Sequence, residues 1–271
     1  MRGTSSTSFA EVLRLTEAAF AGDRTALEPA AQELFSVADA IDSSNQLVRT
    51  LSDPGRPAEV KEATVRSLFA DRVGSQTLEA SLEIMRRRWS EQEDILDALE
   101  LLGVSALLEQ AQSEGVLEQV ETELFDVSHL IDDSGELTVV LDGYREDPSQ
   151  RAIILRTLLD GRVHRHTVAL AARAVGRRID TKPARRVEEF ARFASDRRRR
   201  AFASVSSAVP LNEAQQARLG AVLAGIYGRE VQINLQVDPD VVGGLRIQVG
   251  DDLYDATVLA RLSRARSQLV A

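Results

Sequence analysis

The residues that could carry chemistry are few, and their spacing builds no common kind of site. His164 and His166 are two residues apart, so on a helix their imidazoles lie on different sides and make a poor metal pair. We interpret them, with His129, as surface histidines. The chain has no cysteine, which excludes disulfides and thiol chemistry and favours a reducing compartment. It has no G-x-x-x-x-G-K-[S/T] or G-x-G-x-x-G loop, so we expect no cofactor and no catalytic residue.

Several aspartates near the end of the sequence could suggest a calcium site. They lack the ligand spacing and the closing glutamate of a calcium-binding loop, so we interpret them as turn-forming and solvated. The four are Asp238, Asp240, Asp251 and Asp252.

The run Arg197–Arg200 is the sharpest charge feature. Binding to nucleic acid needs a basic surface and usually stacking aromatics, but Glu188, Glu189 and Asp196 interrupt the basic pattern. We interpret the run as a solvated helix face. An acidic protein partner is the second interpretation, and nucleic acid is the third.

The composition sets the class of protein. With 271 residues, of which 44% are hydrophobic and 28% charged, the chain can form a globular core. Aromatic residues are only 4%, so the core must be mostly Ala, Leu and Val, a bias that favours helices. The net charge of −9 argues against indiscriminate binding to nucleic acid or anionic membranes. No apolar run suits a signal peptide or a membrane span, so we expect a cytoplasmic chain without direct membrane insertion.

A long stretch of the sequence, which we expect to be helical, occurs twice. The stretch ELFSVADAIDSSNQLVRTL at 33–51 recurs as ELFDVSHLIDDSGELTVVL at 123–141, and the register extends without a gap at an offset of ninety. Arg87 thereby matches Arg177. The apolar residues keep one helical spacing in both copies: Leu27, Ala30, Leu34, Val37 and Ile41 match Leu117, Val120, Leu124, Val127 and Ile131. We predict two superposable helical bundles, near 8–102 and 106–200, each around its own core.

Local signals predict where helices begin and end. The pairs Ser8/Glu11 and Thr25/Glu28 have capping-box spacing, which predicts a helix start at each serine or threonine. The segment 54–57, with two prolines and a glycine, predicts a loop in the first copy.

After Arg200 the pattern becomes that of a small α+β module. Residues 201–210 alternate as a strand would, and Asn212 with Gln215 predicts a helix start. The segments 231–237 and 245–249 alternate cleanly, and we expect Asp255 to open a final helix. An antiparallel β-hairpin is predicted within this module. The buried face of its first helix should hold Ala214, Leu219, Val222, Leu223 and Ile226.

About the last seventy residues resemble the C-terminal domain of the delta subunit of F-type ATP synthases, the family of the oligomycin-sensitivity-conferring protein. The family pattern is V-D-P, an apolar residue, G-G, alternating apolars, G-D, then D-x-x-V-x-x-R-L. The positions that carry it here include Asp238, Pro239, Gly243, Gly244, Gly250, Asp251, Asp255 and Arg261. The usual member has one helical bundle, whereas this chain has two, which resembles the long actinobacterial form.

The resemblance implies a non-catalytic stator subunit of the proton-translocating ATP synthase, on the cytoplasmic face of the cell membrane. It implies that the helical part binds the catalytic head through N-terminal helices of the alpha subunits. It also implies that the C-terminal domain grips the C-terminal ends of the b subunits, which stops the head from turning with the rotor. The apolar positions of the last predicted helix are the expected b-subunit contacts: Val258, Leu259, Leu262 and Leu269.

Three domains are predicted from these patterns: helical bundles at 1–104 and 105–202, and an α+β stalk-binding domain at 203–271. The alternative function is a helical adaptor or regulator unrelated to ATP synthase. An enzyme is the third hypothesis, and no residue pattern supports it.

Overall fold

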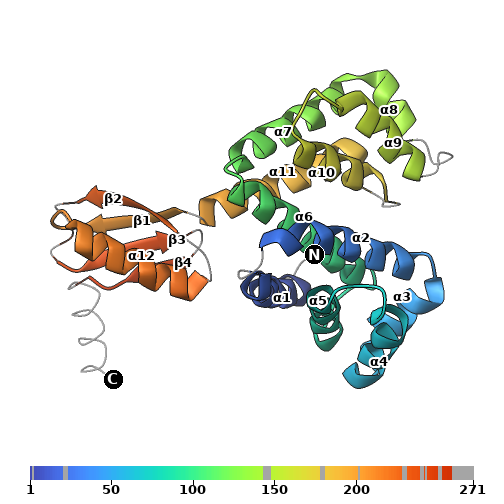
Figure 1. Ribbon diagram of the computed structural model, residues 1–271, viewed down its shortest axis with the longest axis horizontal. Helices are drawn as coiled ribbons and strands as arrows, with labels where there is room; N and C mark the ends of the chain where they lie inside the picture. The colour runs from blue at the N-terminus through green and yellow to red at the C-terminus, as the bar shows by residue number, and fades with distance from the viewer. Residues whose placement is uncertain are drawn as a thin grey trace. The chain divides into compact units, whose positions relative to one another are not determined.

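The computed structural model describes residues 1, 3–20, 24–142, 148–177, 181–200, 202–227, 231–238, 241, 243–249 and 252–257. These residues are mainly helical, with a small sheet near the C-terminal end (Figure 1). The chain divides into two compact units, Met1–Arg192 and Phe193–Ala271. The predicted fold class, mostly α with a small α+β part, is confirmed.

The first unit holds two runs of helices in the same order. The first run is α1 (Thr4–Phe20), the 3-10 turn η1 (Arg24–Ala26), α2 (Leu27–Asp42), α3 (Asn45–Ser52), α4 (Ala58–Phe69) and α5 (Ser75–Arg86). The second run is α6 (Asp94–Ser113), α7 (Leu117–Asp133), α8 (Gly135–Asp142), α9 (Pro148–Leu159) and α10 (Arg165–Val175), and α11 (Pro183–Arg200) follows. Each helix of the second run begins ninety residues after its counterpart, from Thr4 and Asp94 to Ser75 and Arg165. That the two repeats superpose stays a prediction.

One polar contact recurs at matching positions of the two repeats. In each, a glutamate on the second helix accepts hydrogen bonds from a backbone N–H and a threonine hydroxyl at the start of the fifth helix. Glu33 Oε2 lies 3.0 Å from Gly74 N and 2.5 Å from Thr77 Oγ1. Glu123 Oε2 lies 2.8 Å from His164 N and 2.5 Å from Thr167 Oγ1. The carboxylate thus satisfies a free donor at a helix N-terminus, and the repeated sequence joins the same two helices each time.

Helix α6 belongs to both repeats. By the register it is the first helix of the second repeat, and it contacts α7 and α10 there. It also contacts α1, α2 and α5, so it closes the first repeat. Its residues are buried on all sides, as expected for a helix that others enclose. The prediction that each repeat has a core of its own is therefore wrong at α6, which both repeats share. The predicted domain boundaries stay a prediction, and the first of them falls inside α6.

A buried carboxylate on α6 ties this helix to α10 and α11. Glu100 has a side chain that is 1% exposed, and it contacts Arg173 at 2.8 Å, Arg177 at 3.4 Å, and Arg186. Burial alone would raise the pKa of Glu100, but the three guanidinium groups together outweigh burial and hold the pKa below its usual value. Because the charges are enclosed, this cluster constrains the geometry of three helices strongly.

The predicted helix starts are less accurate than the predicted helices. Ser8 lies inside α1, where its hydroxyl donates a hydrogen bond to the carbonyl of Arg88 at 2.8 Å. The residue that precedes α2 is Ala26, whose side chain makes no cap. Both capping boxes are therefore wrong. The predicted loop at 54–57 is confirmed between α3 and α4.

The second unit contains a mixed sheet beside one helix. Its elements are β1 (Phe202–Ser207), α12 (Glu213–Tyr227), β2 (Gln232–Val237), β3 (Leu245–Val249) and β4 (Asp252–Asp255). The strand order is β2-β1-β3-β4, with β1 and β2 parallel and the other neighbours antiparallel. Helix α12 makes the crossover that two parallel strands require. The small core contains Ala203, Val205, Leu223, Val231 and Val249.

Several local predictions for this unit are confirmed. Asn212 and Gln215 cap α12 reciprocally, with Gln215 N 2.8 Å from Asn212 Oδ1 and Asn212 N 3.0 Å from Gln215 Oε1. The strands predicted at 201–210, 231–237 and 245–249 are present. An antiparallel hairpin is present between β3 and β4, but the two strands that were predicted to pair, β2 and β3, are not neighbours, since β1 lies between them.

Other predictions for this unit are wrong. Of the five apolar residues assigned to the buried face of α12, Leu223 is buried, whereas Val222 and Ile226 are exposed. The sheet buries only a narrow stripe along one side of α12, so fewer apolar residues of this helix are buried than predicted. Asp255 is the last residue of β4, a strand that was not predicted, and the final helix expected after Asp255 lies outside the described residues.

Candidate partner-binding surfaces

The histidines serve the packing of α10. His164 precedes α10, and its Nδ1 accepts a hydrogen bond from the backbone N–H of His166 at 3.3 Å. His166 is buried, so the prediction of a surface histidine is wrong for it and confirmed for the exposed His129. The ring of His166 lies 3.0 Å from a carboxylate oxygen of Glu114. Burial lowers the pKa of His166, although Glu114 acts in the opposite direction.

The arginine-rich helix α11 is less exposed than the sequence suggested. Arg197 is buried, so the interpretation of the run as a solvated helix face is wrong for this residue, and Arg186 on the same helix is also buried. Arg186 is held by Glu100 and by Glu189, the latter at 2.8 Å. Acidic side chains of the chain itself therefore occupy part of this basic surface.

Two other kinds of site are absent from the described residues. Within them, no group of three or more His, Cys, Asp or Glu side chains could hold a metal ion. Among the described helices, none is long and apolar enough to cross a membrane.

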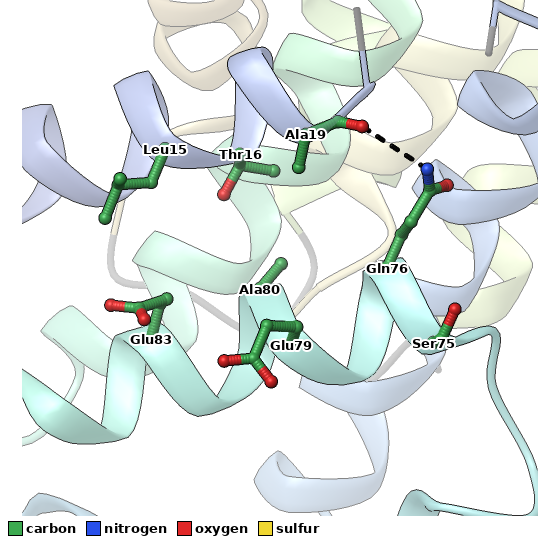
Figure 2. A pocket seen from close by; sticks show the side chains of 8 residues that line it. All are labelled: Leu15, Thr16, Ala19, Ser75, Gln76, Glu79, Ala80 and Glu83. Atoms are coloured by element: carbon green, nitrogen blue, oxygen red, sulfur yellow. Dashed lines mark hydrogen bonds between the residues drawn. The ribbon is translucent and has the colours of Figure 1, made fainter. Parts of the chain in front are cut away.

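A groove lies between α1 and α5 of the first repeat (Figure 2). Its volume is about 340 Å³, and small side chains on the two helices leave its floor open. Thr16 and Ala80 are buried at the base, whereas Leu15 is 37% exposed. At one end the Gln76 amide donates a hydrogen bond to the carbonyl of Ala19 at 3.4 Å. An apolar trough between two helices fits one face of a third, amphipathic helix.

The rim of this groove is acidic. Glu79 and Glu83 are the two charged side chains among the eight that line it, and no basic side chain is among them. Arg86, outside the lining, pairs with Glu79 at 2.7 Å, with Glu62 at 3.0 Å, and with Glu83. These hydrogen bonds, that to Glu62 foremost, raise the pKa of Arg86. Arg87 also pairs with Glu83 at 3.3 Å and with Glu11 at 3.2 Å, and Arg66 pairs with Glu62 at 3.7 Å. Four carboxylates therefore meet three guanidinium groups, which leaves a small negative excess beside the groove. No pattern in the sequence marks this groove, because small residues such as Ala19 and Ala80 also suit an ordinary helix contact.

The second repeat carries exposed apolar side chains where the first does not. Val139 and Val140 on α8, Ile153 and Ile154 on α9, and Leu130 on α7 are all exposed. The matching positions of the first repeat hold small or polar residues: Arg49, Thr50, Ala63, Thr64 and Ala40. Exposed large apolar side chains are candidates for contacts with other proteins. We call these five residues of the second repeat the α7–α9 apolar surface.

Some residues of the predicted family pattern have clear structural roles. Gly244 has a φ of 86°, and a Cβ there would lie 2.4 Å from the carbonyl oxygen of Ala256, so a side chain does not fit. Gly243 precedes it and is partly buried. The backbone N–H of Asp238 donates to the carbonyl of Ser207 at 2.9 Å. Asp255 Oδ1 accepts hydrogen bonds from Thr257 N at 3.0 Å and Thr257 Oγ1 at 2.7 Å.

The remaining residues predicted as sites lie outside the described part of the chain. They are the pattern residues Pro239, Gly250, Asp251 and Arg261, and the expected b-subunit contacts Val258, Leu259, Leu262 and Leu269.

Together these features describe a class of protein: a helical scaffold with a groove between two of its helices, followed by a mixed sheet. Comparison with known proteins specifies the class. A model of the family described as "ATP synthase delta (OSCP) subunit" matches residues 104–269. The ATP synthase subunit delta of Beutenbergia cavernae is 39% identical over 88% of this chain and 88% of its own length. That of Thermobifida fusca is 34% identical over 99% of both, and that of Salinispora arenicola 38% identical over 90% and 89%.

A solved structure of the Toxoplasma gondii mitochondrial ATP synthase hexamer also contains a similar chain. It is 22% identical, covers 62% of this chain and 95% of that one, and has a TM-score of 0.32, too low to support an argument. The sequence matches are sufficient: the chain belongs to the ATP synthase delta (OSCP) subunit family. It is therefore a stator subunit of an F-type ATP synthase, as the resemblance implied, and the alternative of an unrelated adaptor is removed.

Proposed function

We propose that this chain connects the catalytic head of the ATP synthase to its peripheral stalk, and that it does so by binding alone. In this role it resists the torque of the rotor and carries out no reaction of its own. It is a peripheral component on the cytoplasmic face of the cell membrane. Its partners are the N-terminal helices of the alpha subunits and the C-terminal ends of the b subunits.

The observation that carries the proposal is the groove between α1 and α5. The exposed Leu15 offers an apolar contact, and Glu79 and Glu83 offer charges to basic residues beside the apolar face of a partner helix. The N-terminal helix of an alpha subunit is the occupant that the family suggests. A single helix in a groove buries less than the roughly 800 Å² per partner of a standard interface, so we expect further contacts elsewhere on the chain.

The α7–α9 apolar surface is the second contact that we propose with the catalytic head. Its five exposed apolar residues replace small or polar residues of the first repeat. This difference gives the duplicated bundle a use, since it adds a surface that a single repeat would lack.

The stalk contact is proposed from the sequence. The apolar positions Val258, Leu259 and Leu262 recur at helical spacing, and Leu269 continues the pattern. We propose that they pack on a helix of a b subunit. The variant Leu262→Asp should then weaken binding to isolated b subunit, because it places a charge in an apolar contact. Unchanged affinity of a folded variant would contradict this assignment.

The function as a whole is tested by separating hydrolysis from synthesis. ATP synthase would be reconstituted into vesicles with the full chain or with a chain that lacks residues 204–271. The shortened chain should still bind the head, because the groove lies in the first unit. ATP hydrolysis by the head should continue, whereas proton-driven synthesis should stop. The full chain with Asp126→Asn, a change at an exposed position of α7, is the control. Normal proton-driven synthesis with the shortened chain would refute the connector role.

A further inference from the structure

The register of the repeats assigns a second copy of the groove. The lining residues of α1 and α5 correspond to residues of α6 and α10 ninety positions later. Leu15, Thr16 and Ala19 become Ser105, Ala106 and Glu109, and Ser75, Gln76, Glu79, Ala80 and Glu83 become Arg165, His166, Ala169, Leu170 and Arg173. A duplicated chain would be expected to offer two docking sites for partner helices.

Part of the second groove is closed to solvent. Ser105, which matches the 37% exposed Leu15, is 3% exposed. His166, which matches the partly exposed Gln76, is 1% exposed. The chain itself therefore covers this part of α6 and α10.

Helix α2 of the first repeat packs on α6 and reaches α10 through its side chains. It contacts α6 along its length, and Phe35 lies so close to Gly103 that a Cβ there would be 2.4 Å from the ring. The guanidinium of Arg173, on α10, lies over the same ring of Phe35, 4.7 Å from the ring centroid. Phe35 is thus held between the two helices that form the second groove, as the anchoring side chain of a docked helix would be.

Ion pairs align α2 with α10. Two basic residues on α10, and a third just after its end, meet three acidic residues of α2 in the same ascending order, so the two helices run in the same direction. Arg165 pairs with Glu28 at 2.8 Å, Arg173 with Asp39 at 2.9 Å, and Arg177 with Asp42 at 3.9 Å. The end of α1 adds to the cover, since Ser105 Oγ donates a hydrogen bond to Glu17 at 3.3 Å.

The charge at one matching position is reversed between the two grooves. Arg173 in the filled groove faces an acidic helix, whereas Glu83, which pairs with Arg86 and Arg87, stands at the same position of the open groove. A helix that suits the open groove should therefore carry basic residues where α2 carries acidic ones.

We propose that α2 is a built-in occupant of the second groove, so that the duplicated helical region docks one external helix, through α1 and α5, and not two. The external ligand is an amphipathic helix with an apolar stripe and basic flanks. This inference rests on the proposed function, because it takes the α1–α5 groove to be a helix-docking site.

The test is a calorimetric titration of the full chain with a synthetic peptide of the N-terminal 25 or so residues of the cognate alpha subunit. We expect one peptide per chain. Leu15→Ser, which installs the residue of the second repeat, should weaken binding about tenfold or more, because it removes an apolar contact. The control Leu68→Ser makes the same change at a similarly exposed position of α4, outside the groove, and should bind as the parent chain does.

Amide hydrogen exchange with and without the peptide locates the site. We expect added protection in α1 and α5 and none in α6 and α10. Two peptides per chain, or added protection in α6 and α10, would overturn the proposal that α2 fills the second groove. The same conclusion would follow if Leu15→Ser bound one peptide with unchanged affinity and gained protection in α6 and α10. Two other outcomes would overturn the docking role of the α1–α5 groove. One is that the parent chain binds no peptide. The other is that Leu15→Ser and Leu68→Ser bind it equally well, without added protection in α6 and α10.

Discussion

The variant Glu100→Gln removes the carboxylate that three buried arginines share. At an effective dielectric constant of about 20, a pair of charges about 4 Å apart contributes about 4 kcal/mol before the cost of removing each charge from water. The cost of removing the charges from water offsets most of the attraction between Glu100 and its three arginines. Removing the carboxylate alone, however, leaves the arginine charges buried without compensation, which costs about 3–5 kcal/mol. For a unit of this size each 1 kcal/mol shifts Tm by about 2–4 °C, so we expect a loss of about 6–20 °C.

The pH dependence identifies electrostatics as the cause. The pKa of Glu100 is lower in the folded chain than in the unfolded chain, where it is about 4.3. The stabilisation is therefore complete above about pH 4.3 and is lost as the pH falls toward the folded pKa. The difference in unfolding free energy between the parent chain and Glu100→Gln should be constant from about pH 8 to about pH 5.5 and should shrink below about pH 4.

Urea unfolding followed by helical circular dichroism at each pH measures this difference. The control is Asp126→Asn, which neutralises an exposed carboxylate on α7 and should change the free energy of unfolding by less than about 0.5 kcal/mol. A loss of less than about 1 kcal/mol in Glu100→Gln, or a difference that persists unchanged to pH 3, would refute the reasoning.

Two further predictions use matched changes within the chain. Gly244→Ala should destabilise the second unit by about 1–3 kcal/mol, because of its φ of 86° and its contact with Ala256. Gly225→Ala, on α12 where a Cβ meets open space, should stabilise it by about 0.5–1 kcal/mol, and effects of the same sign in urea unfolding would contradict this account. Replacing Val139 by Arg and Ile153 by Ala, the residues of the first repeat, should leave the fold intact but weaken binding to the catalytic head about tenfold. Equal affinity in a titration of head lacking this subunit would exclude the α7–α9 apolar surface as a head contact.

The sequence was sufficient for the features that depend on local pattern. The offset of ninety predicted the order of the helices, and the alternation at 231–237 and 245–249 predicted two strands, because burial on one face imposes a period on the sequence. The reciprocal cap at Asn212 was predicted because both partners lie within one turn.

Features that depend on contacts between distant segments were not predictable in this way. Ser8 has the spacing of a capping residue, but it lies inside α1 and bonds to Arg88, eighty residues away. His166 and Arg186 are of residue types that usually lie on the surface, yet both are buried. His166 contacts Glu114 in the turn after α6, and Arg186 contacts Glu100 on α6. The groove between α1 and α5 also escaped prediction, since an absence of side chains leaves no pattern in the sequence. The family resemblance provided the function, whereas the local patterns provided only the elements.

For a stator subunit, the way in which the two repeats are joined has a mechanical consequence. Two independent bundles on a linker would bend at the linker, because a flexible segment resists little torque. Here α6 serves both repeats, and α7 begins at Leu117, directly after α6 ends at Ser113. The intervening turn is closed by a hydrogen bond from Val116 N to Ala111 O at 2.9 Å, with Gly115 at a φ of 75°. Bending between the repeats would have to separate Phe35 from Arg173 and expose Glu100, which would cost several kcal/mol. The same contacts that fill the second groove therefore stiffen the helical region. In this chain the duplicated repeat adds no second docking site, and its contacts with the first repeat make the helical region rigid.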